Sequence, residues 1–288
     1  MIDPSFAGAM KTGLPTFVVI GAVKGATTWI HDQLQDNPTI FLPGPEPHFF
    51  SKEYDQGLDF YRDMFARAKP GQIVGEKSAD YFAHPLAAER LARTLPDARL
   101  VLQLRNPIDR AYSDYKMLFR RGTVTDGPEA YLDGRESDQP RFLLDGLYAR
   151  HLARWLQHFD ARQIEILLFE DVLSRPSDTV ASVCRHIGAP YHFSTQVGTR
   201  PRNNSAEHFL PLAMRSAFSP MKRAVRPLRG SVAFEGIRRM FAREIAYPPL
   251  TPDLRQRLID YYRADIGHLS AILGRRLDHW VTAERRVA

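Results

Sequence analysis

One short stretch of the chain decides its fold class, and it reads Phe17-Val18-Val19-Ile20-Gly21-Ala22-Val23-Lys24-Gly25-Ala26-Thr27-Thr28. The apolar run at its start predicts a buried strand that ends at Gly21. Beyond the turn, Ile30 and Leu34 are four residues apart, so they share one face of a helix that we expect from Thr28 to Gln35. A strand, a short turn and a helix in this order are typical of the beginning of an α/β protein.

The turn between this strand and this helix is rich in small residues, which indicates an anion site. Small side chains let backbone N–H groups approach a phosphate, and the N-terminus of the following helix adds a positive dipole. Lys24 would add a full charge, and Thr27 and Thr28 would add hydroxyl donors. A Walker A loop has its lysine after the second glycine, whereas Lys24 precedes Gly25, which argues against the use of a magnesium-bound nucleoside triphosphate. A plain turn with a solvated lysine stays open as the alternative at this point.

The chain up to about residue 195 repeats this alternation of strand and helix. We expect further strands at 72–76, 99–104 and 164–169, and helices at 86–95, 108–120, 147–159, 177–187 and, near the end, 252–273. Residues 121–140 are polar and Gly-rich, so they predict a loop or a flap. The pattern predicts a single α/β domain over 1–288, with a central parallel sheet flanked by helices. It would comprise a core of about 15–195, a basic region at 196–250 and a C-terminal helix at 251–280.

The composition is that of an ordinary globular protein, with 44% hydrophobic and 25% charged residues, which excludes disorder as its main state. The single cysteine, Cys184, excludes an intramolecular disulfide framework and a cysteine-rich zinc site, and the scattered histidines give no support for a metal. No apolar run approaches the roughly 20 residues that span a bilayer. Residues 1–15 hold no apolar signal segment, so we expect a cytoplasmic protein without a membrane span. The formal charge of +6 is compatible with anionic partners.

A second anion motif follows the third expected strand and reads Arg105-Asn106-Pro107-Ile108-Asp109-Arg110-Ala111-Tyr112-Ser113. In an open parallel sheet, ligands gather outside the carboxyl ends of the strands, so the two turns predict one ligand with two separate phosphate groups. Arg105 would make a bidentate contact with one of them, and Ser113 would add a hydroxyl. Arg110 is a weaker candidate, and Asp109 is better explained as part of a surface ion pair.

The two motifs resemble those of the sulfotransferases that use 3′-phosphoadenosine 5′-phosphosulfate (PAPS). Residues 21–28 resemble the 5′-phosphosulfate loop of that family, and 104–113 resemble its 3′-phosphate motif. Glu46-Pro47-His48-Phe49-Phe50 and Glu76-Lys77-Ser78-Ala79-Asp80-Tyr81 are similar, in the same order, to segments of the heparan-sulfate type of carbohydrate sulfotransferase. The similarity continues through 148–155 and 169–171 and covers roughly 17–187. It implies the P-loop-like sulfotransferase fold.

The resemblance also implies roles for particular residues. The cofactor-binding set would be Lys24, Gly25, Ala26, Thr27, Thr28, Trp29, Arg105, Ser113, Tyr148, Arg202 and Asn203. The catalytic set would be Glu46, Lys24, His48 and Lys77. Glu46 matches the catalytic glutamate of the heparan-sulfate group, and Lys24 would stabilise the leaving phosphate. Lys77 would lie near the sulfate or the acceptor, while His48 and, with less support, Asp80 are further candidates for proton transfer.

Two features depart from the family pattern. Ala26 stands where the family usually has the second glycine of Lys-Gly-Gly-Thr, a small change that should still fit. The best match to the family's late basic phosphate loop is 200–204, which holds Arg202 and Asn203; a solvated basic loop is the open alternative. The region 196–250 around it would lie on the acceptor or cofactor side of the site.

The implied function is transfer of a sulfuryl group from PAPS, without a metal, to a hydroxyl of a sugar, a glycosylated small molecule or a natural product. An amine is the second choice of acceptor, the transfer would be in line with a general base, and nucleic acid is not an expected partner. One alternative is a nucleotide-dependent phosphotransferase with a degenerate phosphate loop, which a magnesium requirement would favour. Another is a module that binds an anionic polymer through the basic segment 215–243. Steep salt dependence without turnover would favour that module.

Overall fold

The computed structural model describes residues 13–133, 139–199 and 245–282. Within them, one sheet of five parallel strands has the order β2-β3-β1-β4-β5. The strands are β1 (Phe17–Gly21), β2 (Ile40–Phe41), β3 (Ile73–Lys77), β4 (Arg99–Leu104) and β5 (Ile164–Leu168). The predicted α/β fold class, a central parallel sheet flanked by helices, is therefore confirmed.

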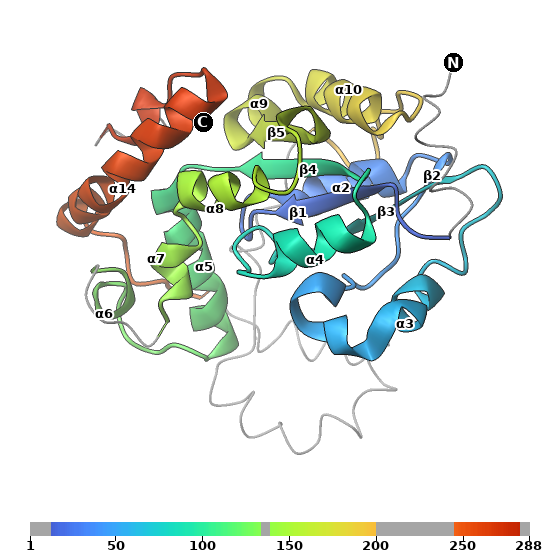
Figure 1. Ribbon diagram of the computed structural model, residues 1–288. Helices are drawn as coiled ribbons and strands as arrows, with labels where there is room; N and C mark the ends of the chain where they lie inside the picture. Colours follow the sequence, from blue (N-terminus) through green and yellow to red (C-terminus); the bar gives the residue numbers. More distant parts are fainter. Residues whose placement is uncertain (1–12, 134–138, 200–244, 283–288) are drawn as a thin grey trace, which may run out of the picture.

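Helices connect the strands and cover both faces of the sheet (Figure 1). The longer ones are α2 (Thr27–Gln35), α3 (Gly57–Asp63), α4 (Ala87–Thr94), α5 (Pro107–Arg121), α8 (Tyr148–Trp155), α9 (Phe169–Ser174), α10 (Pro176–Ile187) and α14 (Pro252–Leu273). Shorter ones are α6 (Glu129–Leu132), α7 (Arg141–Leu144) and single turns at Phe49–Glu53, Tyr54–Gln56, Ala161–Gln163 and Asp278–Trp280. Helix α5 begins at Pro107, where the Asn106 side chain accepts a hydrogen bond from the Ile108 N–H, and Gly122 caps its C-terminal end.

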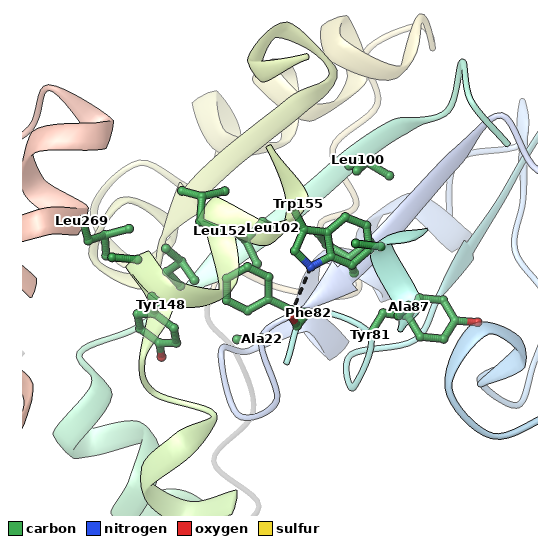
Figure 2. Packing of buried hydrophobic residues seen from close by; sticks show 14 of the residues in the cluster. Ala22, Tyr81, Phe82, Ala87, Leu100, Leu102, Tyr148, Leu152, Trp155 and Leu269 are labelled. Carbon is green, nitrogen blue, oxygen red and sulfur yellow. Dashed lines mark hydrogen bonds between the residues drawn. The ribbon is translucent and has the colours of Figure 1, made fainter. Parts of the chain in front are cut away.

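Successive residues of β1 point to opposite faces of the sheet and enter two separate cores. Val18 lies with Leu100 in the larger core, to which α4, α5, α8 and α14 contribute. Val19 lies with Val101 in a smaller core under α2 and α10. Figure 2 shows part of the larger core, in which the Trp155 indole donates to the Phe82 carbonyl at 3.0 Å. Because both faces are covered, β1 is an unbroken apolar run rather than an alternating one.

The carboxyl ends of β1, β3 and β4 meet at one edge of the sheet, because these strands are parallel neighbours. The chain that leaves β3 turns back beside β1, where the N–H of Phe82 donates to the Ile20 carbonyl at 2.9 Å. Gly21 makes this approach possible: its φ is +147°, and a Cβ there would lie 2.7 Å from the Ala79 carbonyl oxygen. The segments that follow these strands therefore occupy one shared region.

The structure corrects several predicted bounds. The strand predicted at 99–104 and the helix at 252–273 are confirmed, whereas the strand predicted at 72–76 runs one residue later. The sequence did not predict β2 and α3; with two residues, β2 is too short to show a periodicity. The expected loop 121–140 contains helix α6, and the last predicted strand ends at Leu168 because α9 starts at Phe169. The basic region predicted at 196–250 falls mostly outside the described residues, so the predicted domain division stays a prediction.

Candidate active site

The turn between β1 and α2 has the backbone of an anion-binding loop. Lys24 and Ala26 have positive φ values of 68° and 71°, which lets the chain curl through consecutive peptide groups. Gly25 between them has no room for a side chain, because a Cβ would collide with the Gln103 carbonyl oxygen of β4. No side chain caps the first turn of α2, which begins at Thr27. The residues present therefore fit a phosphate or sulfate group at this helix N-terminus.

The Lys24 side chain extends from this loop toward α5. Its Nζ lies 3.9 Å from the Met117 Sδ. Burial lowers the pKa of Lys24; Asp114 opposes this shift, and the positive charges of Arg120, Arg105 and Arg121 add to it. Lys24 thus lies within electrostatic reach of the cation of the second motif, so the two predicted anion turns are parts of one positive region.

The second motif divides into residues that face this region and residues that do not. The guanidinium of Arg105 lies 4.8 Å from the centre of the Phe169 ring, and Ser113 is half-buried on α5. Arg110 is fully buried and donates to the Phe142 carbonyl, so it belongs to the core and is wrong as an anion-binding candidate. Asp109 forms the predicted ion pair, although partly buried, with Arg255 of α14 at 2.5 Å.

On the β3 side of the loop, Glu46 and Lys77 form an ion pair. The Glu46 Oε1 lies 2.7 Å from the Lys77 Nζ, and its Oε2 accepts a hydrogen bond from the Ala79 N–H at 3.1 Å. Lys77 is the last residue of β3 and its side chain is only 7% exposed, whereas the Glu46 side chain is 32% exposed. Two predicted catalytic residues are therefore in direct contact, with the carboxylate on the accessible side.

His48 lies in the same turn and contacts a different carboxylate. Its Nδ1 is 2.7 Å from the Asp80 Oδ1, while Ser51 and Lys52 contact the other oxygen of Asp80 at 2.9 Å and 3.2 Å. Burial alone would raise the pKa of Asp80, but the hydrogen bond and charge of His48, with Lys52 and Ser51, hold it below its usual value. An ionised Asp80 favours the His48 tautomer with its proton on Nδ1, which leaves Nε2 able to accept a proton.

The other predicted cofactor residues have structural contacts in this chain. The Trp29 indole donates to the Gly198 carbonyl at 3.0 Å, which fixes the segment that leads toward residue 200. Tyr148 is fully buried, and its hydroxyl donates to the Arg105 carbonyl at 2.9 Å. Cofactor contacts by Trp29 and Tyr148 stay predictions, and Arg202 and Asn203 lie outside the described residues. Tyr115 lies in the core as expected, with Tyr112 and Phe119 packed against it.

Two features near this turn were not predicted from the sequence: His31 and the buried group around Glu76. Burial lowers the pKa of His31, and the charge of Lys77 lowers it further, while Asp32 and Glu46 act in the opposite direction. His31 therefore lies within electrostatic reach of the Glu46–Lys77 pair, although its direct contact is with Asp32 at 3.3 Å. It lies four residues after Thr27, and this helical spacing from the phosphate loop was the signal that could have found it.

The described residues contain no group of three or more His, Cys, Asp or Glu side chains placed to hold a metal ion. The same residues include no helix whose length and apolar character would allow it to cross a membrane.

These features define a class: an α/β protein with a phosphate loop after its first strand, a cationic turn after a neighbouring strand, and a carboxylate, an imidazole and a lysine beside them. A profile of the sulfotransferase family matches residues 54–193. The chain is 33% identical over 196 residues to human heparan sulfate glucosamine 3-O-sulfotransferase 3B1, an alignment that covers 65% of this chain and 49% of that protein. These matches support a sulfotransferase, and the curated relatives that the chain matches are named for heparan sulfate.

Two further comparisons extend along more of the chain. It is 30% identical over 294 aligned positions to the bifunctional heparan sulfate N-deacetylase/N-sulfotransferase 1 of Xenopus tropicalis. This alignment covers 94% of this chain and 31% of that protein. A crystal structure of a sulfotransferase from Alicyclobacillus acidocaldarius superposes with a TM-score of 0.67 at 23% identity, covering 93% of this chain and 99% of the other. That likeness supports the fold. The chain spans about half the length of the 3-O-sulfotransferase relatives it matches.

Proposed function

We propose that this protein transfers a sulfuryl group from PAPS to a hydroxyl of a carbohydrate or a glycosylated small molecule. The observation that carries the proposal is the position of Lys24, which leaves the phosphate loop and ends 3.9 Å from Met117 on α5, the helix of the Arg105 motif. A ligand with phosphate groups at two separate positions matches two cationic turns that share this lysine. The similarity to enzymes named for heparan sulfate supports a sugar acceptor.

In this proposal, the chain's own residues hold the two phosphate groups of the donor. The loop around Gly25 and the start of α2 would bind the 5′-phosphosulfate through backbone N–H groups. Arg105 and Ser113 would bind the 3′-phosphate, and Arg202 and Asn203 stay predicted contacts. The tight fit at Gly25 supports the first assignment, because the loop backbone packs directly on β4.

The chemistry asks for two actions from the protein. When bound, PAPS supplies the sulfuryl group, whose bond to the 5′-phosphate breaks as its bond to the acceptor oxygen forms. A protein group must take the proton of the acceptor hydroxyl, and a cation must stabilise the charge on the leaving phosphate. Lys24 is the proposed cation. Lys77 would keep the Glu46 carboxylate oriented while its exposed side faces the acceptor.

Two groups compete for the role of base, Glu46 and the His48–Asp80 pair. We assign the proton transfer to Glu46, because its carboxylate is anchored on one side by Lys77 and by the Ala79 N–H yet is 32% exposed. His48 would then orient the acceptor or stabilise the transfer, with its ring fixed by the 2.7 Å contact with Asp80.

The direct test is incubation of the purified protein with PAPS and a panel of sugar acceptors in EDTA, with mass spectrometry for the gain of SO₃. Transfer to at least one sugar by the natural chain, and slower transfer by the Lys24→Ala variant, is the expected result. Magnesium-dependent transfer of phosphate from a nucleotide would replace the proposal with a phosphotransferase. Salt-sensitive binding of a polyanion with no transfer to any acceptor would replace it with a binding module.

A further inference from the structure

We propose that Glu76 is a positioning residue, whose buried carboxylate holds the backbone of the turn that carries His48 through the hydroxyls of Ser78 and Tyr81. The inference rests on the proposed function, since it concerns the turn that presents Glu46 and His48 to the acceptor. Glu76 itself is fully buried, so its carboxylate is not exposed to an acceptor.

Three hydroxyl groups converge on this carboxylate. Tyr61 of α3 donates to the Glu76 Oε1 at 2.7 Å, and Ser78 donates to the Oε2 at 3.1 Å. The Tyr81 hydroxyl lies 3.2 Å from both oxygens. A buried carboxylate requires hydrogen-bond donors to replace the water it has lost, and here all of these donors are hydroxyls.

Two of these hydroxyls also accept hydrogen bonds from the turn. The N–H of His48 donates to the Ser78 Oγ at 2.9 Å, and the N–H of Phe50 donates to the Tyr81 hydroxyl at 3.2 Å. His48 needs such support, because its φ of 52° lies in the left-handed region that residues other than glycine rarely adopt. Glu76, Ser78 and His48 thus form a chain of hydrogen bonds from the core to the turn.

The direction of the protons favours an ionised Glu76. A hydroxyl that gives its proton to the carboxylate keeps its lone pairs for a backbone N–H. A protonated Glu76 would instead have to donate to one of the three hydroxyl oxygens. At Ser78 or Tyr81 it would compete with the N–H of His48 or Phe50, and at Tyr61 it would leave the hydroxyl proton of Tyr61 without its acceptor. Ionisation of Glu76 is therefore the state in which every bond of the network is satisfied.

The pKa of Glu76 lies in a pH range in which protonation of the carboxylate would change this hydrogen-bond network. Burial raises its pKa to about 7; the hydrogen bonds of Tyr61, Ser78 and Tyr81 lower it, and the charge of Asp80 raises it. Above this pH the carboxylate holds the turn in place, and below it the network loses an acceptor. The turnover number should therefore fall as the pH decreases through about 7.

The test measures kcat and KM from pH 5.5 to 8.5, together with the binding of 3′,5′-bisphosphate by calorimetry. In Glu76→Gln, kcat should fall about 10- to 100-fold, as for a displaced catalytic group, while the bisphosphate Kd changes by less than about twofold. The decrease of kcat near pH 7 should also disappear. Ser78→Ala leaves the carboxylate in place and should lower kcat at every pH, which keeps the test valid if Glu76→Gln does not fold.

Tyr61→Phe is the matched control, because the Tyr61 hydroxyl bonds to Glu76 but holds no backbone N–H of the turn. It should retain the kcat reached at high pH and move the decrease to a higher pH, since the carboxylate loses a stabilising donor. Natural kcat and an unchanged pH profile in both Glu76→Gln and Ser78→Ala would overturn the inference and leave the proposed function intact. Absence of transfer by the natural chain would overturn the proposed function itself.

Discussion

The carboxylate of Glu46 and the ammonium of Lys77 form an ion pair of 2.7 Å in which the lysine is nearly buried and the glutamate is not. A partner lost from such a pair leaves the buried charge uncompensated, which is more costly than the loss of a surface pair. Glu46 therefore has two functions in this site, as a proposed base and as the counter-ion of Lys77. A test of its chemistry must keep the shape and polarity of the side chain.

Glu46→Gln meets this condition, since an amide oxygen can still face Lys77 but the side chain cannot take a proton at neutral pH. We expect kcat to fall by roughly 10² to 10⁴, the range typical of a lost general base. The bisphosphate should bind as before, because the cofactor phosphates are assigned to the other side of the loop. Steady-state kinetics with PAPS and calorimetry with the bisphosphate measure the two effects separately.

His48→Asn is the companion variant for the same question. It removes the imidazole but leaves Asp80 with the contacts of Ser51 and Lys52. We expect a smaller loss of kcat than in Glu46→Gln. A larger loss, with bisphosphate binding retained, would move the proton transfer to the His48–Asp80 pair, and near-natural rates in both variants would refute an acceptor site in this turn.

Lys24 and Arg105 should separate chemistry from binding. Lys24→Ala removes the cation proposed for the leaving phosphate, so kcat should fall more than bisphosphate affinity. Arg105→Ala removes a charge-assisted contact, and we expect a weaker bisphosphate affinity by about 1.5 to 3 kcal/mol. Calorimetry and single-turnover rates of both variants measure the difference. An unchanged rate in Lys24→Ala would reduce the loop to a structural turn.

The bisphosphate product should stabilise the natural chain against heat in the presence of EDTA. At about 100 times its dissociation constant, a ligand specific to the folded state adds about 2.7 kcal/mol to the free energy of unfolding. AMP is the control, because it lacks the 3′-phosphate assigned to Arg105 and Ser113. Equal stabilisation by the two nucleotides in a thermal-shift titration would contradict that assignment.

Glu76 should leave a signature in the pH dependence of stability. Its pKa of about 7 in the folded chain exceeds the ordinary 4.5, so the folded state holds the proton more tightly. The stability that this group contributes is complete below pH 4.5 and is lost as the pH rises through about 7, a change of up to about 3 kcal/mol. Glu76→Gln should lack this slope in urea unfolding between pH 5 and 7.5. The exposed Asp97→Asn should keep it, and equal slopes in all three proteins would refute the assignment.

The sequence by itself determined the fold class and the positions of the two turns that we assign to anion binding. These features are local: an apolar run such as 17–20 predicts a buried strand, and helical spacing predicts the element that follows it. The elements that it missed were short or weakly patterned, as in β2. Residues Glu46, His48 and Lys77 were selected by resemblance, without any statement of which would touch.

Only the tertiary structure decided those contacts. Which side chains meet depends on the strand order β2-β3-β1-β4-β5, which places the ends of β1, β3 and β4 together. No periodicity along the chain encodes this order, so the pairing of Glu46 with Lys77 and of His48 with Asp80 could not be derived from spacing. Glu76 illustrates the reason most clearly, because a charged residue in a strand suggests a solvent-facing position. Its full burial is possible because hydroxyls of Tyr61 on α3 and of Ser78 and Tyr81, just after β3, converge on the carboxylate.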